Sequence, residues 1–157
     1  MRTWIISDTH FNHQSLVDVH WRDKDYEKKI KQSLSKIKKD DMLIHLWDIC
    51  MWKDTEVHEK YIEPLLCRKL LVRWNHDNKS NTWYLNHWWD WVVDEYIINI
   101  NNKWVILSHM PIIDIRDWVY NIHWHYHDRL IKPISDYHKL YSPEKEDYEL
   151  KELCNFI

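Results

Sequence analysis

The sequence predicts an α/β domain built around a parallel β-sheet, and three observations lead to this fold class. Short apolar runs of strand length alternate with helical patterns through the first half of the 157 residues. The order strand, helix, strand, helix, strand is typical of βαβ units. The length allows one core, and neither a repeat nor a linker divides the chain, so we expect a single domain over residues 1–157.

The first half supplies the alternating elements. An apolar run over residues 4–7 ends at Asp8 and predicts a buried strand. Tyr26 and Ile30 begin an apolar face at helical spacing, for which Asp23 or Asp25 can act as N-cap. The pattern therefore predicts a helix over 25–39, a strand over 42–46, a helix over 55–66 that Pro64 weakens, and a strand over 69–72.

The second half is richer in strands. We expect strands over residues 91–100, 103–107 and 119–122, joined by short polar loops. Asn101-Asn102 predicts a hairpin turn. Ser142-Pro143 offers an N-cap and a first helical residue, which predicts a short terminal helix.

Composition narrows the class of protein. The net charge of -3 is scattered along the chain, so we see no signature of nucleic-acid or anionic-membrane binding. No apolar run approaches the roughly 20 residues of a membrane span, and we expect neither a membrane segment nor a secretory signal. The 3 cysteines are odd in number and widely spaced, which favours a reducing cytoplasm over a disulfide framework.

Glycine is absent, whereas the chain contains 12 tryptophans. Average usage of about 7% would give roughly eleven glycines in a chain of this length. The excess of tryptophan is of similar size, so the positions of the tryptophans are informative.

Polar residues with metal-binding chemistry follow five of the predicted strands. In open α/β sheets, ligands bind beyond the carboxyl ends of the strands. These residues are Asp8 and His10, Asp48, Asn75-His76-Asp77, His109, and His125 with His127. Each has an ordinary explanation taken alone: Asp48 is suited to a helix N-cap, and Asn75-His76-Asp77 to a turn. Their occurrence together, in this order, predicts a dinuclear metal site.

The spacing and the donor types indicate which metals the site would take. Residues at i and i+2 of an extended chain point to the same side, so the D-x-H and H-x-H pairs can each converge on one centre. Carboxylate and amide oxygens mixed with imidazole suit Mn, Fe, Zn or Ni, with Mn preferred, and no cysteine lies in these motifs.

The ordered set D-x-H, D, N-H-D, H, H-x-H resembles the calcineurin-like metallophosphoesterase superfamily. The match runs from Ser7 to about His127, and the segment 7–13 followed by Arg22 is similar to small bacterial and phage-type members. The resemblance implies an α/β fold of two mixed β-sheets packed as a sandwich flanked by helices. It also implies hydrolysis of a small phosphomonoester or phosphodiester.

The resemblance implies a role for each residue. One metal ion would be held by Asp8, His10, Asp48 and His127, and a second by Asp48, Asn75, His109 and His125, with Asp48 bridging. A bridging hydroxide would attack phosphorus in line. His76 would protonate the leaving oxygen or stabilise the transition state. His13 and Arg22 are candidates for phosphate contact, although Arg22 is equally well read as a surface charge.

The sequence departs from the family pattern at glycine positions. Trp47, Trp74 and Trp124 stand where the family writes glycine beside its ligands, and Trp21, Trp52 and Trp118 also occupy sites suited to glycine. We infer that tryptophan has replaced glycine systematically. Because an indole would strain these turns or fill space beside the metals, we expect the chain as written to be destabilised and weak or inactive.

Two other functions fit parts of the pattern. A catalytically inactive member of the same fold could serve as a protein-binding scaffold, a reading that the tryptophans favour. Another His/Asp metallohydrolase would show an H-E-x-x-H helix or an early H-x-H, and the sequence has neither. The physiological substrate and the oligomeric state stay open at this point.

Overall fold

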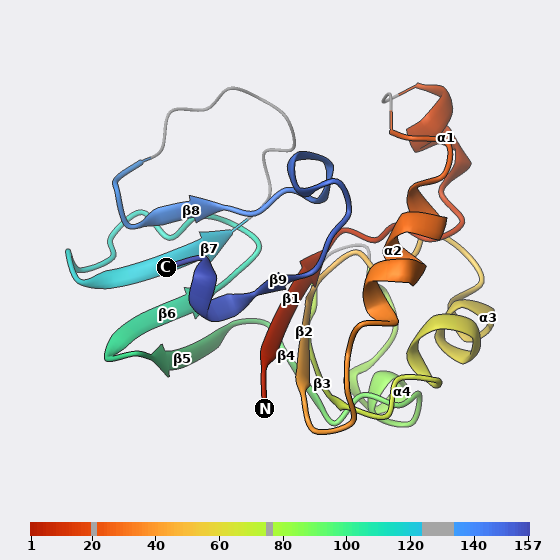
Figure 1. Cartoon of the computed structure of the whole chain (residues 1–157), viewed down its shortest axis with the longest axis horizontal. Helices are drawn as coiled ribbons and strands as arrows, with labels where there is room; N and C mark the ends of the chain where they lie inside the picture. Colours follow the sequence, from red (N-terminus) through yellow and green to blue (C-terminus); the bar gives the residue numbers. More distant parts are fainter. Residues whose placement is uncertain (20–21, 75–76, 124–133) are drawn as a thin grey trace.

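The computed structural model describes residues 1–19, 22–74, 77–123 and 134–157. Two β-sheets lie side by side at its centre (Figure 1): a five-stranded sheet in the order β4-β3-β2-β1-β9 and a four-stranded sheet in the order β5-β6-β7-β8. The strands are β1 (Thr3–Ser7), β2 (Met42–Leu46), β3 (Arg68–Val72), β4 (Trp91–Val93), β5 (Tyr96–Ile100), β6 (Lys103–Leu107), β7 (Val119–His123), β8 (His138–Leu140) and β9 (Lys151–Glu152).

Short helices connect the strands of the first sheet. They are α1 (Gln14–Asp18), α2 (Tyr26–Leu34), α3 (Asp54–Val57), which continues into the π-helical turn η1 (His58–Ile62), and α4 (Asn81–Leu85). Two 3₁₀ turns follow near the C-terminus, η2 (Pro143–Glu146) and η3 (Leu153–Asn155). No helix in the described ranges combines the length and apolarity needed to cross a membrane.

Both sheets are mixed. Strands β1 to β4 run parallel, and β9 joins the edge beside β1 in the antiparallel direction. In the second sheet β5 is antiparallel to β6, whereas β6, β7 and β8 are parallel. The α/β fold with two mixed sheets is therefore confirmed. Its parallel strands bring several carboxyl ends to one edge, which is where ligands bind in such sheets.

Apolar side chains fill two layers. Ile44 and Leu70 of the first sheet pack with Val105, Leu107 and Ile122 of the second, so the sheets face each other across a core. On the other face of the first sheet, side chains of α1, α2, η1 and α4 form a second core with β1, β2 and β3. Figure 1 shows α1 to α4 on the side away from β5–β8. The described α-helices thus cover one face of the sandwich.

Several predicted elements are confirmed. The strand over 42–46 and the strand over 103–107 have the predicted bounds, because continuous apolar runs of strand length form buried strands. The hairpin turn is present: Asn101 and Asn102 have φ of 51° and 64°, as a type I′ turn between β5 and β6 requires.

Three predicted elements are corrected by the structure. The predicted helix over 25–39 ends at Leu34, after which the N–H groups of Lys36 and Ile37 bond to carbonyls only three residues back and no longer continue the α-helical pattern. The apolar run over 91–100 is broken at the exposed Asp94 and Glu95, so β4 joins the first sheet and β5 the second. The predicted terminal helix begins at Pro143 after Ser142, but it is a single 3₁₀ turn that ends at Glu146: Asp147 has φ of 48°, and the chain then pairs with β1 as β9.

Candidate metal centre

Two carboxylates and an imidazole meet where β1 and β2 end. Asp8 directly follows β1, Asp48 is the second residue after β2, and His10 lies two residues beyond Asp8. One ligand atom from each residue lies within 4.8 Å of the others. Nε2 of His10 is 3.7 Å from Oδ1 of Asp8 and 3.8 Å from Oδ2 of Asp48. All three side chains are buried, so the structure brings together three of the predicted metal ligands.

The β1–β2 ladder continues past the strands and holds these residues in register. The backbone N–H of His10 donates to the carbonyl of Asp48 at 3.0 Å, and that of Phe11 donates to the carbonyl of Ile49 at 2.9 Å. The hydroxyl of Thr9 donates to the same Ile49 carbonyl at 2.8 Å. Asp8 and His10 both face the centre, but each has a left-handed φ, of 49° and 44°, and not the extended backbone on which the D-x-H prediction rests.

The electrostatics of the cluster favour a cation. Burial raises the pKa of Asp8 well above its ordinary value, and the nearby charge of Asp48 raises it further. In the described part of the chain, Oδ1 of Asp8 is buried without a hydrogen-bond partner. A buried carboxylate oxygen of this kind is costly unless a charge satisfies it. Two carboxylates and an imidazole are the donors that Mn, Fe, Zn or Ni accept, so these residues fit a metal ion.

A third strand end contributes Asp77, whose carboxylate binds backbone rather than facing the cluster. Its oxygens accept hydrogen bonds from the N–H groups of Asp48 at 3.1 Å, Ile49 at 3.2 Å and Trp74 at 3.0 Å. Burial raises the pKa of Asp77 to about 6, against the lowering effect of these donors. The residue ties the loop that follows β3 to the loop that carries Asp48. The sequence marked Asp77 as part of a motif, but nothing in the pattern showed this positioning role.

His109 lies beside the cluster, enclosed by two indoles. Its ring stacks on that of Trp74, with centroids 4.7 Å apart, and meets the edge of Trp47 at 5.1 Å. Trp47 in turn donates from Nε1 to Oδ2 of Asp8 at 2.7 Å. A fourth predicted ligand, His109, is thus linked to Asp8 through the Trp47 side chain, but it is not part of the group whose ligand atoms lie within 4.8 Å of one another.

The loop that carries His109 is organised by a residue that sequence reasoning missed. Asn121, completely buried on β7, accepts from the N–H of Ile112 at 2.9 Å. Its amide donates to the carbonyl of Ile106 at 3.1 Å and to the hydroxyl of Ser108 at 2.8 Å. These bonds fix both ends of the loop. The sequence signal for this role was an asparagine within an otherwise apolar strand, since a buried amide needs several hydrogen-bond partners.

The backbone around the cluster is strained where glycine is usual. Asp8, His10, Trp47 and Asp48 have φ between 44° and 62°, in the left-handed region that non-glycine residues seldom adopt. The glycine-like position predicted for Trp47 is therefore confirmed by its backbone. Trp52, Trp74 and Trp118 are not among the described residues with positive φ, so their backbone conformations do not require glycine. Trp88, with φ of 71°, was not predicted.

The two residues predicted to contact phosphate have different surroundings. Nδ1 of His13 lies 3.4 Å from Nδ1 of His10, at the margin of the cluster. Arg22 is buried: Nε and Nη2 donate to Glu144 at 2.9 and 2.5 Å, and Nη1 donates to the carbonyl of Thr9 at 3.4 Å. The surface-charge reading of Arg22 is thus wrong, and its role in phosphate contact stays a prediction.

The remaining predicted residues lie outside the described ranges. They are Asn75, His76, His125 and His127, together with Trp21 and Trp124.

Comparison with known proteins shows a likeness to a solved structure. No family model matches the chain, and no curated protein matches it. The fold is similar to the crystal structure of AQ665, a protein of unknown function from Aquifex aeolicus, with a TM-score of 0.77 and 27% identity over 95% of this chain and 94% of that one. The likeness over nearly the full length of both chains supports the two-sheet α/β fold.

Proposed function

We propose that the chain is a metal-dependent phosphoesterase that hydrolyses a phosphomonoester or phosphodiester. The observation that carries the proposal is the convergence of Asp8, His10 and Asp48 within 4.8 Å, at the carboxyl ends of two parallel strands. His109 adds a further ligand type next to the group, through their shared contact with Trp47. This is the order and placement that the resemblance to calcineurin-like metallophosphoesterases implies.

The residues of the chain would divide the work between metal binding and positioning. Asp8 and His10 would hold one ion with Asp48, while Asp48 and His109 would face a second. Bound divalent ions would lower the pKa of a water molecule and so supply a nucleophile near neutral pH. Asp77 would fix the orientation of the Asp48 loop, because its carboxylate accepts the Asp48 and Ile49 N–H groups. His76 is the proposed proton donor to the leaving oxygen.

The experiment compares hydrolysis of an aryl phosphodiester and an aryl monoester in Mn²⁺, with and without chelator. The chain, Asp48→Asn, and the triple variant Trp47→Gly/Trp74→Gly/Trp124→Gly are assayed together. We expect metal-dependent hydrolysis that is stronger in the triple variant and lost when Asp48→Asn is added to it. Absence of metal binding and of hydrolysis in both the chain and the triple variant would overturn the proposal.

A scaffold role is the second candidate, and the Trp47 indole favours it. The indole N–H occupies one oxygen of Asp8, and Trp47 and Trp74 fill the space around His109. In that case the chain and the triple variant would fold without binding Mn²⁺ at the cluster. The same assay series separates the two functions.

A further inference from the structure

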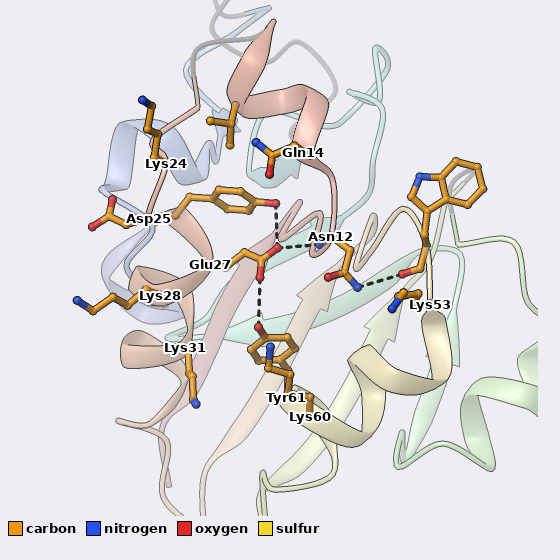
Figure 2. Close-up of a pocket in the computed structure, with 13 residues that line it drawn as sticks. Asn12, Gln14, Lys24, Asp25, Glu27, Lys28, Lys31, Lys53, Lys60 and Tyr61 are labelled. Carbon is orange, nitrogen blue, oxygen red and sulfur yellow. Dashed lines mark hydrogen bonds between the residues drawn. The ribbon is translucent and has the colours of Figure 1, made fainter.

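A hollow of about 960 Å³ lies beside the two loops that carry the metal ligands. Its wall includes Asn12, which is two residues past His10, and Trp52, which is four residues past Asp48. The side-chain amide of Asn12 donates to the Trp52 carbonyl at 3.4 Å and joins the two loops. Helix α2 lies on one side of the hollow and the turn η1 on the other (Figure 2). The backbone of the two ligand loops therefore connects the hollow directly to the candidate metal centre.

The floor of the hollow is built around Glu27. Its carboxylate accepts hydrogen bonds from the N–H of Asn12 at 2.8 Å, the hydroxyl of Tyr26 at 3.4 Å and the hydroxyl of Tyr61 at 3.2 Å. Figure 2 shows these three donors converging on it. Tyr26 also donates to the carbonyl of His10 at 2.7 Å. The floor thus connects α2, η1 and the first ligand loop into one rigid surface.

The walls carry a local excess of positive charge, although the whole chain has a net charge of -3. Five lysines line the hollow against two carboxylates, those of Asp25 and Glu27; the lysines are Lys24, Lys28, Lys31, Lys53 and Lys60. Lys53 pairs with Glu56 at 3.0 Å. Within the described ranges the other four form no ion pair. Lys24, Lys28 and Lys31 are exposed, and Nζ of Lys60 lies over the Tyr61 ring, 4.8 Å from its centroid, so their ammonium groups can face an anionic ligand.

Three of the basic residues lie along one side of the hollow. Lys28 and Lys31 are three residues apart on α2 and so share a face of the helix, and Lys24 lies in the turn just before it. A second hollow of about 330 Å³ shares Lys31, Lys60 and Tyr61 with the first and extends to Lys39. Together the two hollows form an elongated basic groove. Trp52, with 68% of its surface exposed, lies at the end nearest the ligand loops.

We propose that this basic groove binds single-stranded nucleic acid, whose phosphodiester bonds the metal centre would hydrolyse; the second clause rests on the proposed function. A row of lysines matches a backbone of repeated phosphates, and an exposed indole offers a base a stacking surface. A phosphopeptide or inorganic polyphosphate would use the lysines alone. The exposed indole across the hollow from Lys28 and Lys31 therefore favours a ligand that carries both phosphates and aromatic bases.

Binding is tested by fluorescence anisotropy with a labelled oligodeoxythymidylate of about 15 nucleotides, with chelator present so that no cleavage occurs. We expect Lys28→Glu/Lys31→Glu to weaken binding and to reduce the slope of log K against log salt by about 1.4, since each phosphate contact on a single strand contributes about 0.7. The control Lys103→Glu/Lys139→Glu makes the same charge change on the second sheet and should leave binding unchanged. Circular dichroism verifies that each variant is folded.

A second comparison identifies the class of polyanion. Trp52→Ala should weaken binding of the oligonucleotide about tenfold, as for one stacked base, and leave binding of an abasic oligonucleotide unchanged. Equal binding of both oligonucleotides by the chain, or displacement of the label by inorganic polyphosphate or a phosphopeptide as readily as by unlabelled oligonucleotide, would overturn the assignment to nucleic acid. An equal loss of oligonucleotide binding in Lys28→Glu/Lys31→Glu and in the control Lys103→Glu/Lys139→Glu would overturn the groove as the binding site.

Different experimental results would overturn the assignment of the groove and the proposed function. If both are correct, Lys28→Glu/Lys31→Glu loses oligonucleotide binding but hydrolyses a small aryl phosphodiester at the rate of its parent. If the groove binds the oligonucleotide in chelator and no variant hydrolyses either ester in Mn²⁺, the groove assignment stands and the proposed function is overturned.

Discussion

The indole N–H of Trp47 donates a 2.7 Å hydrogen bond to Oδ2 of Asp8, so a core tryptophan occupies one oxygen of a predicted metal ligand. Trp47 is completely buried and has φ of 62°, a conformation suited to glycine. The same indole packs against His109 with ring centroids 5.1 Å apart. The Trp47 side chain therefore lies between two predicted ligands, Asp8 and His109. Its removal should affect metal affinity and folding stability in opposite directions.

Replacing Trp47 with glycine is expected to raise the affinity for Mn²⁺ and to lower the stability of the metal-free protein. Relief of a left-handed backbone is worth about 1–3 kcal/mol, whereas removal of a fully buried tryptophan costs about 3–5 kcal/mol or more. The loss of packing exceeds the relief of strain. Calorimetric titration with Mn²⁺ and urea unfolding measure the two effects.

Trp88→Gly is the matched control, because Trp88 has φ of 71° but is only partly buried and packs on the helix side of the first sheet. It should alter stability without altering Mn²⁺ affinity. An equal rise in affinity in both variants would show that general loosening, and not release of Asp8, is responsible.

Asp77→Ala is expected to destabilise the protein by roughly 3 kcal/mol or more. The substitution leaves the N–H groups of Asp48, Ile49 and Trp74 without their acceptor, and each buried unsatisfied group costs about 1–3 kcal/mol. Loss of the support for Asp48 should also weaken Mn²⁺ binding about 10–100-fold. Asp40→Ala, in the exposed loop before β2, provides the control for urea unfolding and titration. Unchanged Mn²⁺ affinity in Asp77→Ala would contradict the positioning role.

The strands and the first three ligands were predictable for a common reason. Residues 42–46 form an apolar run interrupted only by His45, of which Leu43 to Leu46 are buried, and polar residues that follow such strands meet at one edge of a parallel sheet. Both signals are local. The strand β9 was not predictable, because its 2 residues have no periodicity of their own and are ordered by pairing with β1.

Other features of the site depend on contacts that sequence spacing does not encode. The carboxylate of Asp77 acts through backbone N–H groups of a loop that lies nearly thirty positions earlier in the chain. The direction of the Trp47 indole follows from its φ and from the core around it. Sequence could mark both positions as unusual, but their partners emerge only when the strand ends are assembled.

Two buried histidines predict a loss of stability in mild acid. His45 donates from Nε2 to the Thr9 hydroxyl, which itself donates to Ile49, and His58 donates from Nδ1 to the carbonyl of Asp54. Burial lowers the pKa of His45 to about 3 and that of His58 to about 4. Both rings are therefore neutral in the folded protein, with the second ring nitrogen unpartnered among the described residues.

The unfolded chain binds protons at these histidines below about pH 6.5, whereas the folded chain does not. Their contribution to stability is complete above that pH and falls on acidification towards the folded pKa values, by about 1.4 kcal/mol per pH unit for each histidine. Urea unfolding between pH 7.5 and 4.5 should show a smaller slope in His58→Phe than in the parent. Parallel slopes would contradict burial of a neutral His58.

Asn121→Ala is expected to loosen the loop that carries His109. Three hydrogen-bonding groups lose a partner: the Ile112 N–H, the Ile106 carbonyl and the Ser108 hydroxyl. We expect a loss of about 2–3 kcal/mol in the free energy of unfolding and weaker binding of a second Mn²⁺ than of the first. Asn99→Ala is the matched control, because it removes the same side chain from an exposed position on β5. Equal weakening of both sites would place the effect outside the His109 loop.

The most direct test of the metal centre is anomalous diffraction from crystals soaked in Mn²⁺. We expect an anomalous peak bonded to Asp8, His10 and Asp48. In Trp47→Gly we expect a second peak that shares Asp48 and lies on the side of His109. Crystals of both proteins with Mn²⁺ bound elsewhere, or with no anomalous peak at this cluster, would contradict this expectation.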